Sequence, residues 1–530
     1  MSQKIIKLTS FILLVCVLLS GCSVLDGLLA TRLVRYDRME YVRPDMDEFD
    51  AVLERSCASA LEETDIKELE TAILNFYDVY DDFYTNFSLA MIAHSRDLSD
   101  IYWEGEYVYC NAQSATADAG LDQLYRCLVK SPLRQTLEGE DYFGAGFFDD
   151  YDTDNRWTSA FTALLEEEAR LESEYYRLTS ELSNLRSGSD EYSDMAERMA
   201  QLLVDLINLR RDIASQWGYD SYMDYAWDVY YYRDYTPEQM ERYMADIVRV
   251  LVPLYEQLAD TDVWSYSGRY ADEAQTFAFV RTAAMQMGGT VAEAFLLMES
   301  ESLYDISYSP DKYPTSFEMY LTGYGVPFVY LCPEREVYDR LTFAHEFGHF
   351  CNDYASEGTS VGVDVLEVFS QGMEYLTLCY GLDTDALTRV KLADSLCVYV
   401  EQSAFAAFEH RAYAMPEEEL SVDTLYDLYD RVATEYGFGS IGYDANEFIT
   451  VSHFYTNPFY IDSYVVSNDA ALQLYQKEQA QAGNGLKIFE ESLATEEGYF
   501  LAFLEEAGLD SPFTPGRMET VKNTLSQVLQ

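Results

Sequence analysis

The stretch His345-Glu346-Phe347-Gly348-His349 has two histidines four positions apart and a glutamate directly after the first. On an α-helix, residues four apart share one face, about 40° apart around the axis and about 6 Å along it. Both imidazoles can therefore reach one metal ion, with the carboxylate of Glu346 beside that ion. This H-E-x-x-H pattern is typical of zinc hydrolases, in which the glutamate takes a proton from a water molecule. The alternative is a helix with two ordinary histidines and a solvated glutamate.

A catalytic zinc site needs a third protein ligand and an open position for water. The longer motif with another histidine six residues after His349 is absent, because Asn352 and Ala355 stand where glycine and histidine are required. We therefore expect a carboxylate ligand from the segment that follows. Glu367 and Glu374 are seven positions apart and share one face of a predicted helix, so spacing alone leaves both as candidates.

The composition is that of a globular protein, since the 530 residues are 48% hydrophobic and 15% aromatic with only 12 prolines. The 93 acidic and 35 basic residues give a formal net charge of −58. We expect no nucleic-acid partner, because phosphate binding needs clusters of Lys and Arg. A strongly negative surface favours solubility, and it also attracts cationic peptides and repels anionic ones.

The first residues have the pattern of an export signal that ends at a lipidated cysteine. Lys4 and Lys7 precede a mostly apolar segment, Leu8 to Leu19, which is too short to span a bilayer as a helix. Leu19-Ser20-Gly21-Cys22 then resembles the bacterial lipobox. We expect a signal peptide over residues 1–21 and a body held outside the cytoplasmic membrane by lipid on Cys22. An ordinary signal peptide followed by a coincidental cysteine is the alternative.

Helical periodicity dominates the rest of the chain. Apolar residues recur at intervals of three and four from Leu202 to Ile213. Residues 159–214 are predicted as two long antiparallel helices, interrupted at Ser187-Gly188-Ser189-Asp190. We predict an N-terminal helical region over residues 22–200 and a catalytic domain over residues 201–530.

The periodicity changes from helix-like to strand-like just before the metal motif. Phe317 to Leu321 and Pro327 to Leu331 are short aromatic and β-branched runs, separated by Thr322-Gly323-Tyr324-Gly325. This pattern predicts a β-hairpin. A strand edge beside a metal-binding helix suits an extended peptide substrate, which can add to it as a further strand. Packing of the hairpin without substrate contact is an equally good alternative.

The sequence has nine cysteines. Cys16 is expected to be removed with the signal peptide, and Cys22 is expected to carry the lipid. The remaining seven are odd in number, so at least one is free, and none has the C-x-x-C spacing of a metal site. A large helical core needs no disulfide for its stability. The sequence leaves disulfides open, and Cys110 with Cys127 is the one pair considered, without being favoured.

Around these motifs the sequence resembles the oligoendopeptidase F and thimet oligopeptidase family of zinc metallopeptidases. The matching residues are Phe343 to His349, Glu367-Val368-Phe369-Ser370-Gln371, and His453-Phe454-Tyr455 with Phe459-Tyr460 and Tyr464. The resemblance extends over roughly Leu202 to Phe513 and implies that Glu367 is the third ligand, beside His345 and His349, of one zinc ion per chain.

The resemblance further implies a mainly α, two-lobed fold with a small β-hairpin beside the active-site helix. A deep channel in this fold admits short peptides and excludes folded proteins. Downstream His and Tyr side chains in the family donate hydrogen bonds to the substrate carbonyl and its oxyanion, and the best matches are His453, Tyr460 and Tyr464. A phenol stays protonated at neutral pH and suits this role. Which of the two tyrosines acts is left open.

Together these features predict a zinc-dependent endopeptidase that hydrolyses short oligopeptides, with Glu346 as the general base. The alternative from another class is a catalytically inactive, lipid-anchored protein that binds peptides with the same fold. The expected partners are short peptides and, through the lipid on Cys22, the membrane. No oligomeric state is predicted.

Overall fold

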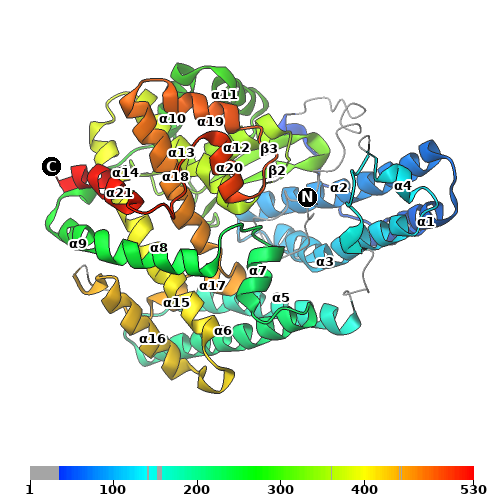
Figure 1. Ribbon diagram of the computed structural model, residues 1–530, viewed down its shortest axis with the longest axis horizontal. Coiled ribbons are helices and arrows are strands. Elements are labelled where there is room, and N and C mark those ends of the chain that lie inside the picture. Colours follow the sequence, from blue (N-terminus) through cyan, green and yellow to red (C-terminus); the bar gives the residue numbers. More distant parts are fainter. Residues whose placement is uncertain are drawn as a thin grey trace. The chain divides into compact units, whose positions relative to one another are not determined.

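The computed structural model describes residues 35–139, 142–151, 158–359, 361–440, 442 and 444–529. Most of these residues are helical, and a three-stranded sheet lies among the helices (Figure 1). The predicted mainly α class is confirmed. The predicted signal peptide and Cys22 lie outside the described residues.

The chain forms two compact units that alternate along the sequence. The first comprises Met1–Asn155, Tyr270–Ser360 and Leu493–Glu496, and the second comprises Arg156–Arg269, Val361–Ser492 and Glu497–Gln530. The domain boundary that we predicted at residue 200 falls inside α6, in the second unit.

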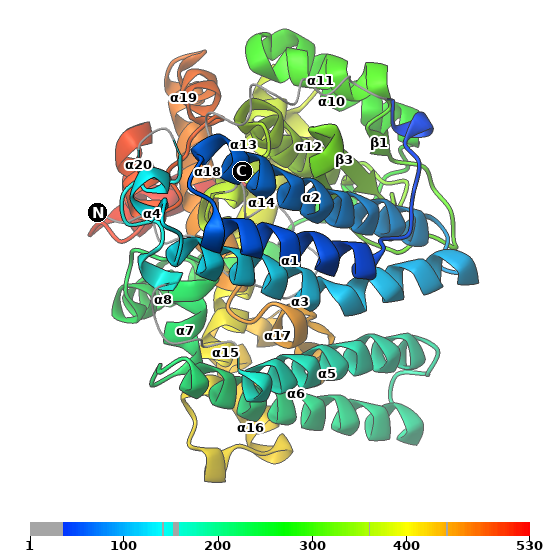
Figure 2. The same cartoon turned by 90° about the vertical axis from the view of Figure 1, so that its right-hand side faces the viewer.

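The elements of the first unit are α1 (Met46–Glu62), α2 (Ile66–Arg96), α3 (Ile101–Val129), α4 (Arg134–Leu137), α10 (Glu273–Met287), α11 (Gly289–Glu301), β1 (Tyr304–Asp305), β2 (Ser316–Leu321), β3 (Val326–Leu331) and α12 (Asp339–Ser356). The long helices α1, α2 and α3 lie side by side (Figures 1 and 2). Each begins after an N-cap aspartate, whose carboxylate accepts hydrogen bonds from backbone N–H groups of the first turn. These aspartates are Asp45, Asp65 and Asp100. The caps and a buried aromatic core that includes Phe49, Phe76 and Phe83 stabilise this bundle.

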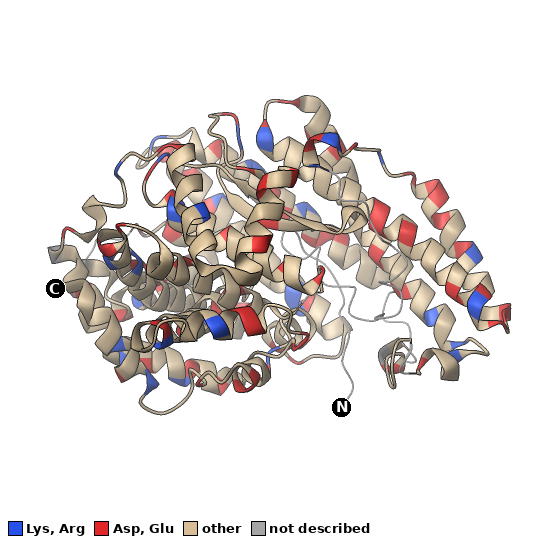
Figure 3. Ribbon diagram, turned by 90° about the horizontal axis from the view of Figure 1, so that it is seen from above, with Lys and Arg blue, Asp and Glu red and all other residues tan. Residues whose placement is uncertain are grey.

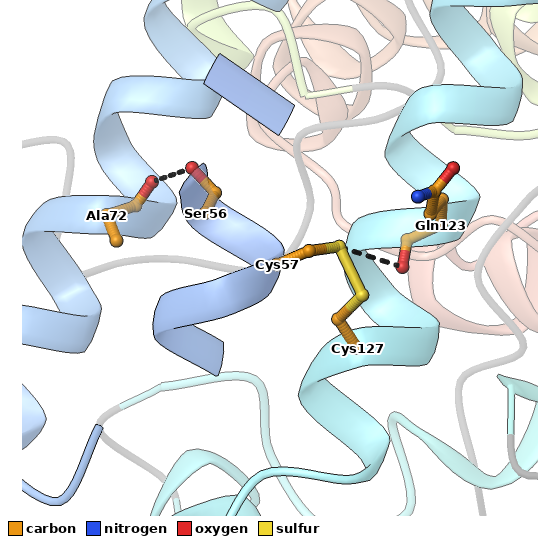
Figure 4. Close-up of a disulfide and its surroundings, with 5 residues drawn as sticks. All are labelled: Ser56, Cys57, Ala72, Gln123 and Cys127. Atoms are coloured by element: carbon orange, nitrogen blue, oxygen red, sulfur yellow. Dashed lines mark hydrogen bonds between the residues drawn. A yellow bond between two sulfur atoms is a disulfide. The ribbon is translucent and has the colours of Figure 1, made fainter. Parts of the chain in front are cut away.

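A disulfide joins Cys57 on α1 to Cys127 on α3 (Figure 4). Their Cα atoms are 5.3 Å apart although 70 positions separate them in sequence. The sequence left disulfides open, and this pair was not the one considered. The pairing depends on direct packing of α1 against α3, which cysteine spacing does not reveal. Cys110, the partner considered for Cys127, is buried and forms no disulfide.

We expect the Cys127→Ser variant to lose about 2–4 kcal/mol of unfolding free energy, because the bond restricts the unfolded chain. Urea unfolding, with and without a reductant, measures this loss. Cys110→Ala is the control, since it removes a buried thiol outside the disulfide. A reductant should weaken the wild type and the control while leaving Cys127→Ser unchanged. Equal stability of the reduced and oxidised wild type would contradict a stabilising disulfide.

The sheet has the strand order β1-β3-β2, with β2 antiparallel to β3 and Ser316 opposite Leu331. The predicted hairpin is confirmed. Helix α12, which carries the H-E-x-x-H motif, packs against both β2 and β3. Every residue from Phe317 to Leu321 is buried, so most of β2 packs in the interior.

The helices of the second unit are α5 (Ser159–Ser183), α6 (Asp190–Gln216), α7 (Tyr222–Val229), α8 (Pro237–Val250), α9 (Val252–Tyr255), α13 (Val363–Tyr380), α14 (Asp385–Cys397), α15 (Ser403–Ala414), α16 (Val422–Glu435), α17 (His453–Thr456), α18 (Ile461–Ala480), α19 (Asn484–Ser492), α20 (Phe500–Ala507) and α21 (Arg517–Leu525). The predicted pair over residues 159–214 is confirmed as α5 and α6, which lie side by side (Figure 2). Helices α13 and α18 approach closely at Gly372, where a Cβ atom would lie 2.9 Å from Leu474.

Acidic residues are distributed along most of the helices, and the fewer Lys and Arg residues are interspersed among them (Figure 3). In the part of the chain that the structure describes, none of the helices combines the length and the apolar character that crossing a membrane would require.

Candidate active site

The two histidines of the motif lie one turn apart on α12, with ring centroids 5.1 Å apart. Burial, followed by the proximity of His345, lowers the pKa of His349 well below its usual value. This imidazole is therefore neutral at physiological pH, which is the form that binds a metal ion.

Glu367 lies on α13, which follows α12 after a short connection, residues 357–362. The potential ligand atoms of His345, His349 and Glu367 lie within 4.8 Å of one another. Two imidazole nitrogens and one carboxylate oxygen form the donor set of a catalytic zinc site, with a fourth position left for water. The residues present thus fit a zinc ion.

Glu374, the other candidate from spacing, has a different partner. One of its carboxylate oxygens lies 2.7 Å from Nζ of Lys391, and both side chains are buried. A buried ammonium group neutralises this carboxylate. Of the two candidates, Glu367 is therefore the one that groups with the histidines.

Both carboxylate oxygens of Glu367 accept hydrogen bonds. The Tyr460 hydroxyl donates to Oε1 at 2.7 Å, and the Ser370 hydroxyl donates to Oε2 at 2.8 Å. Burial, and then the charge of Glu367, raises the pKa of Tyr460 well above its usual value, so this phenol remains a donor. Such contacts orient a metal-binding carboxylate.

Glu346 is buried, and its Oε1 atom accepts a hydrogen bond of 2.7 Å from the hydroxyl of Ser316, at the start of β2. Ser316 was not among the predicted site residues, because only strand pairing brings this hydroxyl to α12. Glu318 follows two positions later and is also buried. Burial and the carboxylates of Asp353 and Glu346 raise the pKa of Glu318 well above its usual value. Burial and these neighbouring carboxylates therefore disfavour the charged form of this side chain.

His453, Tyr460 and Tyr464 form an aromatic cluster. Their three pairs of ring centroids are 5.2–5.6 Å apart, and the Tyr464 hydroxyl lies 3.4 Å from Nε2 of His453. Burial lowers the pKa of His453 to about 4, so its imidazole is neutral near pH 7. The structure thus brings the three predicted residues together, and Tyr460 connects them to Glu367.

Comparisons with known proteins bear on the family resemblance and the fold. Residues 36–158 match the family model described as the peptidase M3 N-terminal domain. A solved oligoendopeptidase F from Bacillus anthracis aligns over 94% of this chain and 98% of its own, with a TM-score of 0.77 and 19% identity. The resemblance to the oligoendopeptidase F-like M3 peptidase family is confirmed.

Other oligoendopeptidase F-like folds align over similar lengths. A structure described as PZ peptidase A with an inhibitor has a TM-score of 0.79 and 18% identity over 93% of this chain and 99% of its own. An oligoendopeptidase F from Enterococcus faecium has a TM-score of 0.54 and 15% identity over 91% of this chain and 97% of its own. Among curated protein sequences, none matches this chain. At these identities, the solved structures establish the oligoendopeptidase F-like fold.

Proposed function

We propose that this protein is a zinc-dependent endopeptidase that hydrolyses short oligopeptides. The observation that carries the proposal is the grouping of His345, His349 and Glu367 within 4.8 Å. Glu346, one position after the first of these ligands, supplies the carboxylate that hydrolysis needs. The match of residues 36–158 to the peptidase M3 N-terminal domain and the oligoendopeptidase F-like fold support a peptidase.

In the proposed mechanism, His345, His349 and Glu367 would hold one zinc ion per chain, which would supply polarisation of the scissile carbonyl and a lowered pKa for a water molecule. Glu346 accepts a proton from the attacking water and passes it to the departing amine. The oxygen of that water forms the new C–O bond while the peptide C–N bond breaks, which yields a carboxylate and a free amine.

The surrounding side chains position the reacting groups. The Ser316 hydroxyl donates to Glu346 and holds this carboxylate in one orientation. The neutral imidazole of His453 and the hydroxyl of Tyr464 are placed together and can donate hydrogen bonds to the oxyanion that forms on the substrate carbonyl. We assign a different role to Tyr460, because its hydroxyl already donates to Glu367.

These assignments predict different defects for the two tyrosines. Tyr464→Phe should lower kcat about 100-fold with little change in zinc content, because it removes a donor to the transition state. Tyr460→Phe should weaken zinc binding about 10- to 100-fold, because Glu367 loses an orienting hydrogen bond. Steady-state kinetics with zinc titration against a competing chelator separates the two effects. The opposite pattern would exchange the two roles.

Cleavage assays test the activity itself. An internally quenched fluorescent peptide should be cut at an internal bond, and mass spectrometry of the products identifies that bond. A folded protein that contains the same sequence should resist cleavage, since the proposed substrates are short peptides. Tight binding of the peptide without cleavage would instead support the inactive peptide-binding alternative.

We also propose that lipid on Cys22 holds the body of the protein outside the cytoplasmic membrane. The basic Lys4 and Lys7, the apolar Leu8 to Leu19 segment and the Leu-Ser-Gly-Cys ending support this location. The Cys57–Cys127 disulfide adds independent support, because such bonds persist in oxidising compartments. Metabolic labelling with a fatty acid should mark the wild type and spare Cys22→Ala.

A further inference from the structure

The segment between His453 and Tyr460 is held by buried polar side chains from elsewhere in the second unit. We propose that these side chains position His453 and Tyr460 for catalysis, an inference that rests on the proposed function. We call them the backbone clamp, and they are Arg210, Tyr231, Arg233 and Glu409.

The first part of the clamp binds α17. Arg210, on α6, is fully buried and donates from Nη1 to the carbonyl oxygen of Phe454 at 2.9 Å and from Nη2 to that of Tyr455. Helix α17 has only four residues, which is too short to be stable by itself. The positive charge of Arg210 at the carbonyl groups of Phe454 and Tyr455 stabilises it.

The charge of Arg210 is balanced on its other side. Glu168 accepts from Nε at 2.7 Å, and Glu172 accepts from Nη2 at 3.3 Å, both from buried positions on α5. A buried guanidinium that lacked these carboxylates would be strongly destabilising. Helices α5 and α6 thus place an arginine whose charge is balanced by two carboxylates against the segment that begins with His453.

The second part of the clamp binds the residues just before Tyr460. The Tyr231 hydroxyl donates to the carbonyl oxygen of Pro458 at 2.8 Å, and Arg233 donates to that of Phe459 at 2.8 Å. The Phe459 N–H donates to Oε2 of Glu409, also at 2.8 Å. Both backbone polar groups of Phe459 are therefore bound to buried side chains.

Phe459 is where the backbone needs such support, because its φ angle is +68°. A bulky residue other than glycine rarely adopts this conformation, and it persists only where the surroundings enforce it. The left-handed backbone conformation of Phe459 helps to set the direction of the next side chain, Tyr460, whose hydroxyl reaches Glu367. The clamp therefore fixes the groups at both ends of the segment before substrate binds, as transition-state stabilisation requires.

The test uses Tyr231→Phe, the mildest change to the clamp. It removes one hydroxyl and keeps the ring, which lies over the guanidinium of Arg233 at 4.5 Å. Replacing Arg210 would leave two buried carboxylates unpaired and threatens the fold. The matched control is Tyr109→Phe in the first unit, because the Tyr109 hydroxyl also donates to a prolyl carbonyl, that of Pro44, at 2.9 Å.

We expect Tyr231→Phe to lower kcat about 10-fold and to change KM less than about twofold, because His453, a donor to the oxyanion, is less well placed. Zinc affinity should fall less than in Tyr460→Phe, because the Tyr460 hydroxyl is still present to donate to Glu367. Hydrogen exchange should become faster in peptides that cover residues 452–460. Tyr109→Phe should match the wild type in both measurements. A Tyr231→Phe enzyme with wild-type kcat, or with unchanged exchange in this segment, would overturn the proposal.

The two measurements also separate this inference from the proposed function. If the wild type cleaves no peptide, the peptidase proposal fails, while hydrogen exchange still decides whether Tyr231 restrains the segment. If the wild type is active and Tyr231→Phe loses nothing, the positioning role alone fails.

Discussion

Glu346→Gln should retain its zinc and lose peptidase activity by about 10³- to 10⁴-fold, because the substitution removes the general base and none of the metal ligands. Gln has nearly the same shape as Glu, and the Ser316 hydroxyl can still donate to its amide oxygen. The defect should appear in kcat, so saturating substrate should not restore the rate. Stopped assays with an internally quenched peptide, together with metal analysis, measure both quantities.

The matched control for this experiment is Glu357→Gln, directly after the same helix, where the side chain is exposed. It removes one negative charge from the region without touching Glu346 or the ligand group. We expect wild-type kinetics and zinc content from it. Wild-type turnover by Glu346→Gln would refute the proposed mechanism, even if zinc were present.

The second large effect distinguishes the two glutamates of α13. Glu367→Gln should weaken zinc binding by about 100-fold or more and abolish activity at limiting zinc, because an amide is a much poorer ligand than a carboxylate. Glu374→Gln should keep zinc affinity and instead lower the unfolding free energy by on the order of 3 kcal/mol, since it breaks a buried ion pair with Lys391.

Zinc titration and urea unfolding of both variants give a clear comparison. The two side chains are seven positions apart on one helix and receive the same chemical change. Loss of zinc from Glu374→Gln, with zinc retained by Glu367→Gln, would reverse the assignment of the third ligand.

The parts of the site that could be predicted from the sequence are those encoded by local spacing. Residues four apart lie on the same face of a helix whatever its tertiary contacts. The spacing of His345 and His349 is therefore enough to predict that both can bind one metal ion. The hairpin was also predictable, because strand-forming runs on either side of a Gly-rich turn are a local signal. The family resemblance then selected Glu367 and the His453 cluster.

The parts that could not be predicted depend on contacts between distant segments. Cys57 and Cys127 pair across 70 positions because α1 packs against α3. Glu374 and Glu367 are distinguished by Lys391, a residue of the next helix. Ser316 reaches Glu346 through strand pairing. None of these partners has a sequence pattern that marks it.

The backbone clamp illustrates the same limit of local patterns. Arg210 lies among the apolar residues of α6. A charged side chain is usually exposed to solvent. Arg210 is instead fully buried, because two glutamates of α5 and two backbone carbonyls of α17 surround it. The positive φ angle of Phe459 likewise follows from tertiary contacts and not from residue type.

The central claim is that one metal ion, bound by His345, His349 and Glu367, is required for peptide hydrolysis. The most direct measurement is the metal content of the purified protein together with its activity before and after removal of the metal by a chelator. We predict one zinc per chain, complete loss of cleavage on chelation and recovery when zinc is restored. Protein that contains no transition metal yet cleaves peptides, or cleavage that a chelator leaves unchanged, would contradict this account.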